Sequence, residues 1–138
     1  MPKDAFGALV DALARRDLTS TELEQRLLRA GFDPSACSDA LERAFDAGYL
    51  DDARVVIERA ERLAERGASD AAIRAELERR GVTSEDVEAA LAAVTPEGER
   101  ADRLAARLGG GRRAARALAR KGYPDDIVER TIRLHIAE

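Results

Sequence analysis

Arginine is the side chain of this sequence best suited to bind another molecule, and it is densest between residues 100 and 121. Eight basic residues lie in this stretch against a single acid, Asp102. They are Arg100, Arg103, Arg107, Arg112, Arg113, Arg116, Arg120 and Lys121. Like charges three and four positions apart on a helix are destabilising unless an anion compensates them. The cluster therefore predicts contact with an anion, either an acidic protein surface or nucleic-acid phosphate.

A second group of arginines lies earlier in the chain. Arg74, Arg79 and Arg80 have only Glu76 and Glu78 within helical reach, three bases against two acids. Two interpretations stay open for this group, contact with a partner or a solvated helix face.

Arginines and glutamates alternate between residues 54 and 66 at the spacing of neighbours on a helix surface. Such pairs stabilise a helix by roughly 0.2–0.5 kcal/mol each. We predict a solvated helix whose own side chains form ion pairs: Arg54 with Glu58, Glu58 with Arg62, and Arg62 with Glu65.

No combination of side chains predicts catalysis. The chain has one cysteine, Cys37, and one histidine, His135, which is expected in the last turn of the final helix. Its Gly109–Gly111 run lacks the Gly-Lys-Ser/Thr ending of a phosphate-binding loop. We expect Cys37 to be a small buried side chain. We therefore predict no catalytic residue, no cofactor and no enzyme activity.

The adjacent carboxylates of Asp51 and Asp52 are a ligand type that hard cations prefer. A helix that begins at this point explains the pair without an ion, because an N-terminal cap and the helix dipole both favour aspartate. We favour the helix explanation and predict no metal site.

Composition predicts an all-α protein. Alanine, leucine, glutamate and arginine, the strongest helix formers, dominate the 138 residues, while aromatic residues make up 4% and tryptophan is absent. With so few large side chains we expect elongated helical packing. No apolar run approaches 18 residues and the first residues do not show the charged, apolar and small-residue pattern of a leader, so we expect no membrane contact and a cytoplasmic location. No unused apolar heptad demands a dimer, so we expect a monomer.

One pattern occurs three times when the chain is aligned on Gly31, Gly81 and Gly122. Four residues before each glycine stands a leucine, and one residue after it an apolar or aromatic side chain; the leucines are Leu27, Leu77 and Leu118. Each unit reads as a helix, a left-handed glycine and a second helix, with another amphipathic stretch upstream. We predict three tandem three-helix modules, residues 1–50, 51–97 and 98–138, in an elongated and curved helical repeat.

Helix starts are marked by capping residues. Thr19 stands three residues before Glu22, as in a capping box, and Thr83 stands three before Asp86. Asp33 precedes Pro34, which favours the first helical position. These signals place helix starts near residues 20, 34 and 84.

The sequence resembles the RecX family, bacterial regulators of the RecA recombinase. The resemblance rests on GYLDDAR joined to IRAELERRGV at the family's spacing, with ARRDLTSTELEQRLLRAGF before them and ARKGYPDDIVERTI after them. It covers about Ala5 to His135. Two features depart from the family: Val55 and Val56 stand where an aromatic residue is usual, and the net charge is −4 where members are often basic.

The resemblance implies a non-enzymatic protein that binds RecA, typically along the groove of the RecA–DNA filament. It implies restraint of RecA's ATPase, strand-exchange and coprotease activities. Charge is unevenly distributed along the chain. Residues 1–98 carry 13 basic and 21 acidic side chains, net −8, and residues 99–138 carry 10 basic and 6 acidic side chains, net +4. We expect the basic faces of the second and third modules to contact the filament, with weak direct nucleic-acid contact as a further possibility.

Two alternatives stay open. One is a helical DNA-binding or architectural protein whose units act like helix-turn-helix modules, although the negative net charge disfavours binding dominated by phosphate contacts. The other is a helical-repeat adaptor with a different protein partner.

Overall fold

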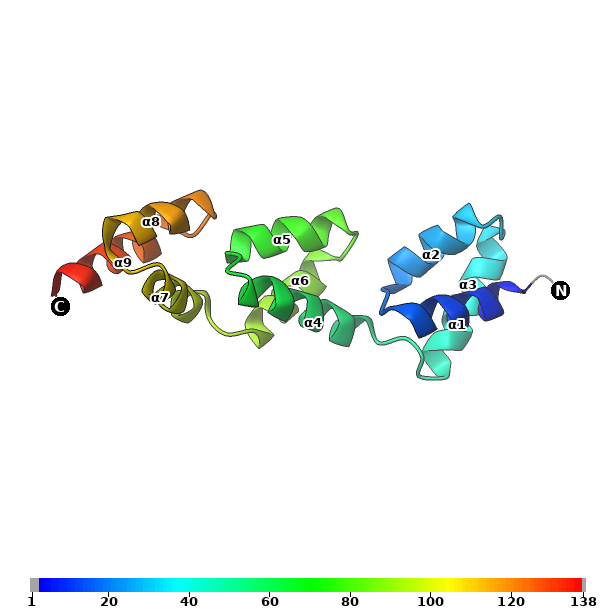
Figure 1. Cartoon of the computed structure of the whole chain (residues 1–138). Helices are drawn as coiled ribbons and strands as arrows, with labels where there is room; N and C mark the ends of the chain where they lie inside the picture. Colours follow the sequence, from blue (N-terminus) through cyan, green and yellow to red (C-terminus); the bar gives the residue numbers. More distant parts are fainter. Residues whose placement is uncertain (1–2, 138) are drawn as a thin grey trace.

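The computed structural model describes residues 3–137, with side chains as far as residue 133, so the side chain of His135 lies outside the described part. This part of the chain folds into α-helices joined by short loops, without a β-strand (Figure 1). The helices are α1 (Ala5–Arg15), α2 (Ser20–Arg29), α3 (Pro34–Asp46), α4 (Asp52–Glu65), α5 (Asp70–Arg79), α6 (Ser84–Ala93), α7 (Glu97–Arg107), α8 (Gly111–Arg120) and α9 (Asp125–Ala137).

The predicted caps begin the helices. Thr19 accepts a hydrogen bond from Glu22 N, and the Glu22 carboxylate accepts one from Thr19 N, which completes the capping box of α2. Asp33 caps α3 with Pro34 in its first turn, and Thr83 caps α6. These contacts satisfy amide groups that the first helical turn leaves without an intrahelical partner.

Glycines end the second helix of each module. Gly31, Gly81 and Gly122 have φ of 99°, 86° and 91°, a conformation that side chains other than glycine rarely adopt. After each glycine the next amide donates back to the leucine four residues before the glycine, as Phe32 N does to Leu27 O at 3.2 Å. This arrangement is a Schellman ending, and it confirms the prediction made from the glycine repeat.

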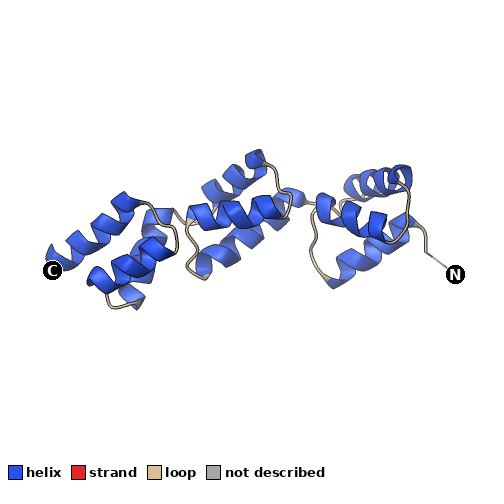
Figure 2. Cartoon of the chain, turned by 90° about the horizontal axis from the view of Figure 1, so that it is seen from above, coloured by secondary structure: helices blue, strands red, loops and turns tan. Residues whose placement is uncertain are grey.

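Each set of three helices encloses its own small core. The first core includes Leu9, Leu23 and Cys37, the second Ile73 and Leu77, and the third Leu118 and Tyr123 among others, all at most 4% exposed. Helices pack mainly within their own set, and the sets follow one another along an elongated array (Figures 1 and 2). The prediction of an all-α array of three three-helix modules is confirmed; the predicted residue boundaries stay predictions.

Polar groups join the first module to the second. Ser20 N donates to Asp52 Oδ1 at 2.9 Å, and Ser20 Oγ donates to Asp52 Oδ2 at 2.5 Å. Arg59 of α4 pairs with Glu22 of α2 at 2.7 Å and donates to the backbone oxygen of Asp17 at 3.0 Å. We call these contacts the first joint. Burial alone would raise the pKa of the Glu22 carboxyl, but hydrogen bonds from Arg59 and Thr19 outweigh it and lower the pKa.

The second joint repeats the design between the second and third modules. Asp70 N donates to Glu97 Oε2 at 2.7 Å, just as Ser20 N donates to Asp52. In both joints a carboxylate from the first turn of the next module caps the second helix of the preceding one. Ser69 Oγ also donates to the backbone oxygen of Lys121 at 2.9 Å.

The structure corrects the prediction for residues 54–66. Arg54 pairs with Glu58 at 3.0 Å as predicted. Arg59 is directed to the first module, and the predicted pairs of Arg62 with Glu58 and Glu65 are not among the ion pairs of the described residues. Arg54 and Arg59 reach acids of the first module, Asp17 at 3.5 Å and Glu22 at 2.7 Å, and spacing along one helix does not indicate these contacts.

Asp51 caps α4 by accepting a hydrogen bond from Arg54 N at 3.1 Å, and Asp52 caps α2 across the first joint. The helix explanation of this carboxylate pair is confirmed. Within residues 3–137 no helix has the length and apolar character needed to span a bilayer.

Candidate partner-binding surface

Helix α8 has two sharply different faces. Gly111, Ala114, Ala115 and Leu118 are buried against the third core. The opposite side carries five exposed cations, which we call the basic ridge: Arg112, Arg113, Arg116, Arg120 and Lys121. Small residues on the inner face let α8 lie close to its neighbours in the third set of helices (Figure 1).

The basic ridge has no acidic counterpart in the described part of the chain. No ridge side chain takes part in an ion pair within the described residues. Elsewhere in that part of the chain many arginines pair with carboxylates. Its one side-chain hydrogen bond runs from Arg116 Nε to the backbone oxygen of Arg112, at 3.5 Å. Like charges at helical spacing therefore repel one another in the free chain, and an anionic surface would relieve this repulsion.

The start of α8 adds to the positive potential. Gly109, Gly110 and Gly111 all have positive φ, and Gly110 offers no side chain to cap the helix. The first turn contains Arg112 and Arg113 and no acid. The amide groups and positive dipole end of the helix therefore reinforce the two guanidinium groups.

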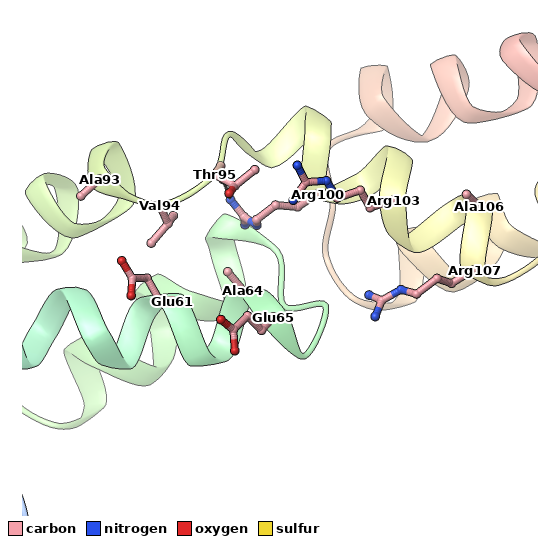
Figure 3. Close-up of a pocket in the computed structure, with 10 residues that line it drawn as sticks. All are labelled: Glu61, Ala64, Glu65, Ala93, Val94, Thr95, Arg100, Arg103, Ala106 and Arg107. Atoms are coloured by element: carbon pink, nitrogen blue, oxygen red, sulfur yellow. Dashed lines mark hydrogen bonds between the residues drawn. The ribbon is translucent and has the colours of Figure 1, made fainter.

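Arg103 and Arg107 lie on α7 and border a groove of about 700 Å³ between the second and third modules (Figure 3). Arg103 is 71% exposed and lies 3.9 Å from Glu99, a surface contact that holds it weakly. Across the groove, α4 presents Glu61 and Glu65. Sequence analysis missed the role of these two glutamates, because local spacing does not connect α4 with α7.

Arg100 is placed differently from the rest of the predicted cluster. Its side chain is 5% exposed, pairs with Asp70 at 2.8 Å, and donates to the backbone oxygens of Thr95 and Ala68 at 2.8 and 3.1 Å. The structure corrects the inclusion of Arg100 in a surface cluster. It links the second and third modules, and the free chain already satisfies its charge.

Arg74, Arg79 and Arg80 are held by carboxylates of the chain itself. Arg74 reaches from α5 to Glu88 of α6, with Nε 2.6 Å from Oε1, and this hydrogen bond raises the Arg74 pKa. Arg79 and Arg80 share Glu76, at 2.5 and 2.9 Å. Both interpretations of this group, partner contact and a solvated helix face, stay predictions, because surface ion pairs are weak enough for a partner to replace.

The sequence is similar to known bacterial proteins. Over 136 residues it is 33% identical to a protein named Regulatory protein RecX from Xanthomonas axonopodis pv. citri (strain 306), covering 91% of this chain and 84% of that protein. The chain belongs to the RecX family. The family model of the first three-helix domain of RecX matches residues 5–43, which include α1, α2 and most of α3.

Solved RecX structures share the fold. A crystal structure of RecX from Lactobacillus salivarius superposes with a TM-score of 0.78 at 20% identity, covering 94% of this chain and 92% of that one. A second crystal structure, of a regulatory protein RecX, gives a TM-score of 0.76 at 19% identity over 92% of this chain and 70% of that one. Identity at this level supports the arrangement of the helices alone.

The groove of this chain offers charged side chains and no group arranged for catalysis among its lining residues. The groove is lined by carboxylates, guanidinium groups, small apolar side chains and one threonine. Within the described residues no group of three or more His, Cys, Asp or Glu side chains is placed to hold a metal ion. Cys37 is buried in the first core, as predicted.

Proposed function

We propose that this chain is a non-enzymatic, cytoplasmic regulator that binds the RecA recombinase on its nucleoprotein filament as a monomer. Binding restrains the ATPase, strand-exchange and coprotease activities of RecA. The observation that carries the proposal is the basic ridge, an unpaired cationic surface in a family whose members are named as regulatory proteins. An elongated array suits a polymer, because several modest contacts spread along it add through effective concentration.

The test is ATP hydrolysis by the cognate RecA on single-stranded DNA, with the full chain titrated in. We expect the wild-type chain to inhibit hydrolysis and the triple variant Arg112→Glu, Arg113→Glu, Arg116→Glu to lose about tenfold or more in potency. Glutamate is favourable at positions 112 and 113, in the first turn of α8, and circular dichroism of the triple variant checks that its helices form. Unchanged inhibition by this variant would remove the ridge from the contact.

A matched control carries the same change in charge at the other end of the array. Arg15, Arg26 and Arg29 are exposed residues of the first module, outside the ion pairs of the described part. Reversing all three to glutamate should leave inhibition within about twofold of wild type, because rim charges far from a contact act only through screened long-range fields. Thermal unfolding of this variant checks its fold, since glutamate in the last turn of α1 or α2 opposes the helix dipole. Equal loss in both variants would point to net charge instead of a ridge contact.

Direct DNA binding is the second candidate function, favoured by the uncapped, arginine-rich start of α8. Retention of the full chain on single-stranded DNA at physiological salt, lost in the ridge variant, would support it. In that case inhibition of RecA would follow from competition for DNA and would fade when DNA is in excess.

A further inference from the structure

The groove between the second and third modules has two charged walls of opposite sign. Glu61 and Glu65, one helical turn apart, come from α4, and Arg103 and Arg107, also one turn apart, come from α7 (Figure 3). All four side chains are exposed. Of these four side chains, only Arg103 has an ion-pair partner in the described part of the chain, and that partner is Glu99 at 3.9 Å.

The floor between these walls is made of small side chains. Ala64, Ala93, Val94 and Ala106 line the groove, so a partner backbone can approach closely. Arg100 lies at the same floor, and its buried Nε has no hydrogen-bond partner in the described residues.

We infer that this groove is a docking site for an α-helix of the protein partner. The helix would carry acidic side chains one turn apart along one edge, basic side chains one turn apart along the other, and small apolar residues between them. Rows of opposite charge beside an apolar seam are the means by which helices select partner and orientation. The inference rests on the proposed function for the identity of the partner, RecA.

The acidic wall argues against nucleic acid as the occupant. Phosphate groups placed against Arg103 and Arg107 would lie across the groove from the unpaired carboxylates of Glu61 and Glu65. Like charges that face each other at an interface disfavour binding of the wrong partner. A helix bearing both signs of charge satisfies both walls at once.

Charge reversal tests the site in the full chain, with binding measured to RecA assembled on single-stranded DNA. Reversing either wall, as Glu61→Lys with Glu65→Lys or Arg103→Glu with Arg107→Glu, should weaken binding about tenfold or more. The matched control is Glu24→Lys with Glu42→Lys, two exposed glutamates of the first module that should leave affinity unchanged. Thermal unfolding of each variant checks the fold.

Reversing both walls together distinguishes a partner helix from simple closure of the groove. If the walls only pair with each other, the four-residue swap restores the attraction and recovers wild-type affinity, which overturns the inference. If a partner helix occupies the groove, each of its charged edges faces a wall of the same sign in the four-residue variant. This variant should therefore bind the filament as weakly as either single-wall variant or more weakly.

Three other outcomes also overturn it. Tighter binding by the Glu61→Lys, Glu65→Lys variant would identify DNA phosphate as the occupant. Wild-type affinity in every groove variant would exclude the groove while leaving the proposed function in place, whereas absence of filament binding by the wild-type chain would contradict both.

Discussion

Arg100 illustrates how position decides the role of a guanidinium group in this chain. Three acceptors surround it: the Asp70 carboxylate and the backbone oxygens of Thr95 and Ala68. Three positions further along the same helix, Arg103 is 71% exposed. The residue type is the same, but one side chain joins modules and the other faces solvent at the groove.

Replacing Arg100 by methionine keeps the apolar stem and removes the donors. The Asp70 carboxylate loses its guanidinium partner, and the Thr95 oxygen loses a donor in a part-buried site. We expect the free energy of unfolding to fall by about 2–4 kcal/mol, since stranded acceptors and a broken buried pair are costly. Urea denaturation followed by circular dichroism measures the change.

Arg103→Met is the matched control for this substitution. The exposed side chain makes only a distant ion pair, so its replacement should leave the unfolding midpoint unchanged. Equal effects of the two substitutions would mean that the contacts of Arg100 contribute nothing specific to stability.

The glycines that end equivalent helices also differ in their surroundings. Gly31 and Gly122 end equivalent helices with nearly equal φ, 99° and 91°. A Cβ at Gly31 would meet nothing within 4 Å, whereas one at Gly122 would lie 3.2 Å from Ser69 Oγ, inside the second joint. One turn is open to solvent and the other is part of a module interface.

Alanine at each glycine separates these two effects. Gly31→Ala should cost about 1–2 kcal/mol of stability, the penalty of the left-handed conformation alone. Gly122→Ala pays the same penalty and also displaces Ser69, which donates to the Lys121 oxygen at 2.9 Å, so we expect it to be the more destabilising. Thermal unfolding of both variants gives the comparison, and equal losses would show that the Ser69 contact is easily accommodated.

Sequence patterns predicted the elements well because their signals are local. The Thr19 capping box and the Gly31 ending each involve residues within a few positions of one another. The joints were not predictable in this way. Arg59 meets Glu22 and Arg100 meets Asp70 across module boundaries, and helical spacing rules relate only neighbours three or four positions apart. For the same reason the two walls of the groove were not recognised from the sequence.

The whole molecule is a chain of small cores connected by polar joints. Its module interfaces depend on a few hydrogen bonds and ion pairs, such as Ser20 with Asp52 and Asp70 with Glu97. Tyr123 adds a hydrogen bond from its hydroxyl to the Gly67 oxygen at 2.9 Å across the second joint. Interfaces of this kind resist bending less than a shared apolar core does, so the joints decide how straight the array is.

Removing the two joint carboxylates should therefore change shape more than folding. In the double variant Asp52→Ala, Glu97→Ala, the first turns of α2 and α5 each lose a capping acceptor from the next module. We expect unchanged helical content by circular dichroism and a broader distribution of intramolecular distances by small-angle X-ray scattering. Glu42→Ala with Glu85→Ala, at two exposed positions outside the joints, is the control that should preserve the wild-type scattering curve.

The same variant connects shape to the proposed function. The basic ridge and both groove walls keep their side chains, so each local contact with a partner is intact. A looser array holds these surfaces in register for a smaller fraction of time, and the gain from linked contacts falls with effective concentration. We expect weaker inhibition of RecA ATP hydrolysis by about three- to tenfold. Wild-type inhibition from a visibly loosened array would show that one module alone carries the contact.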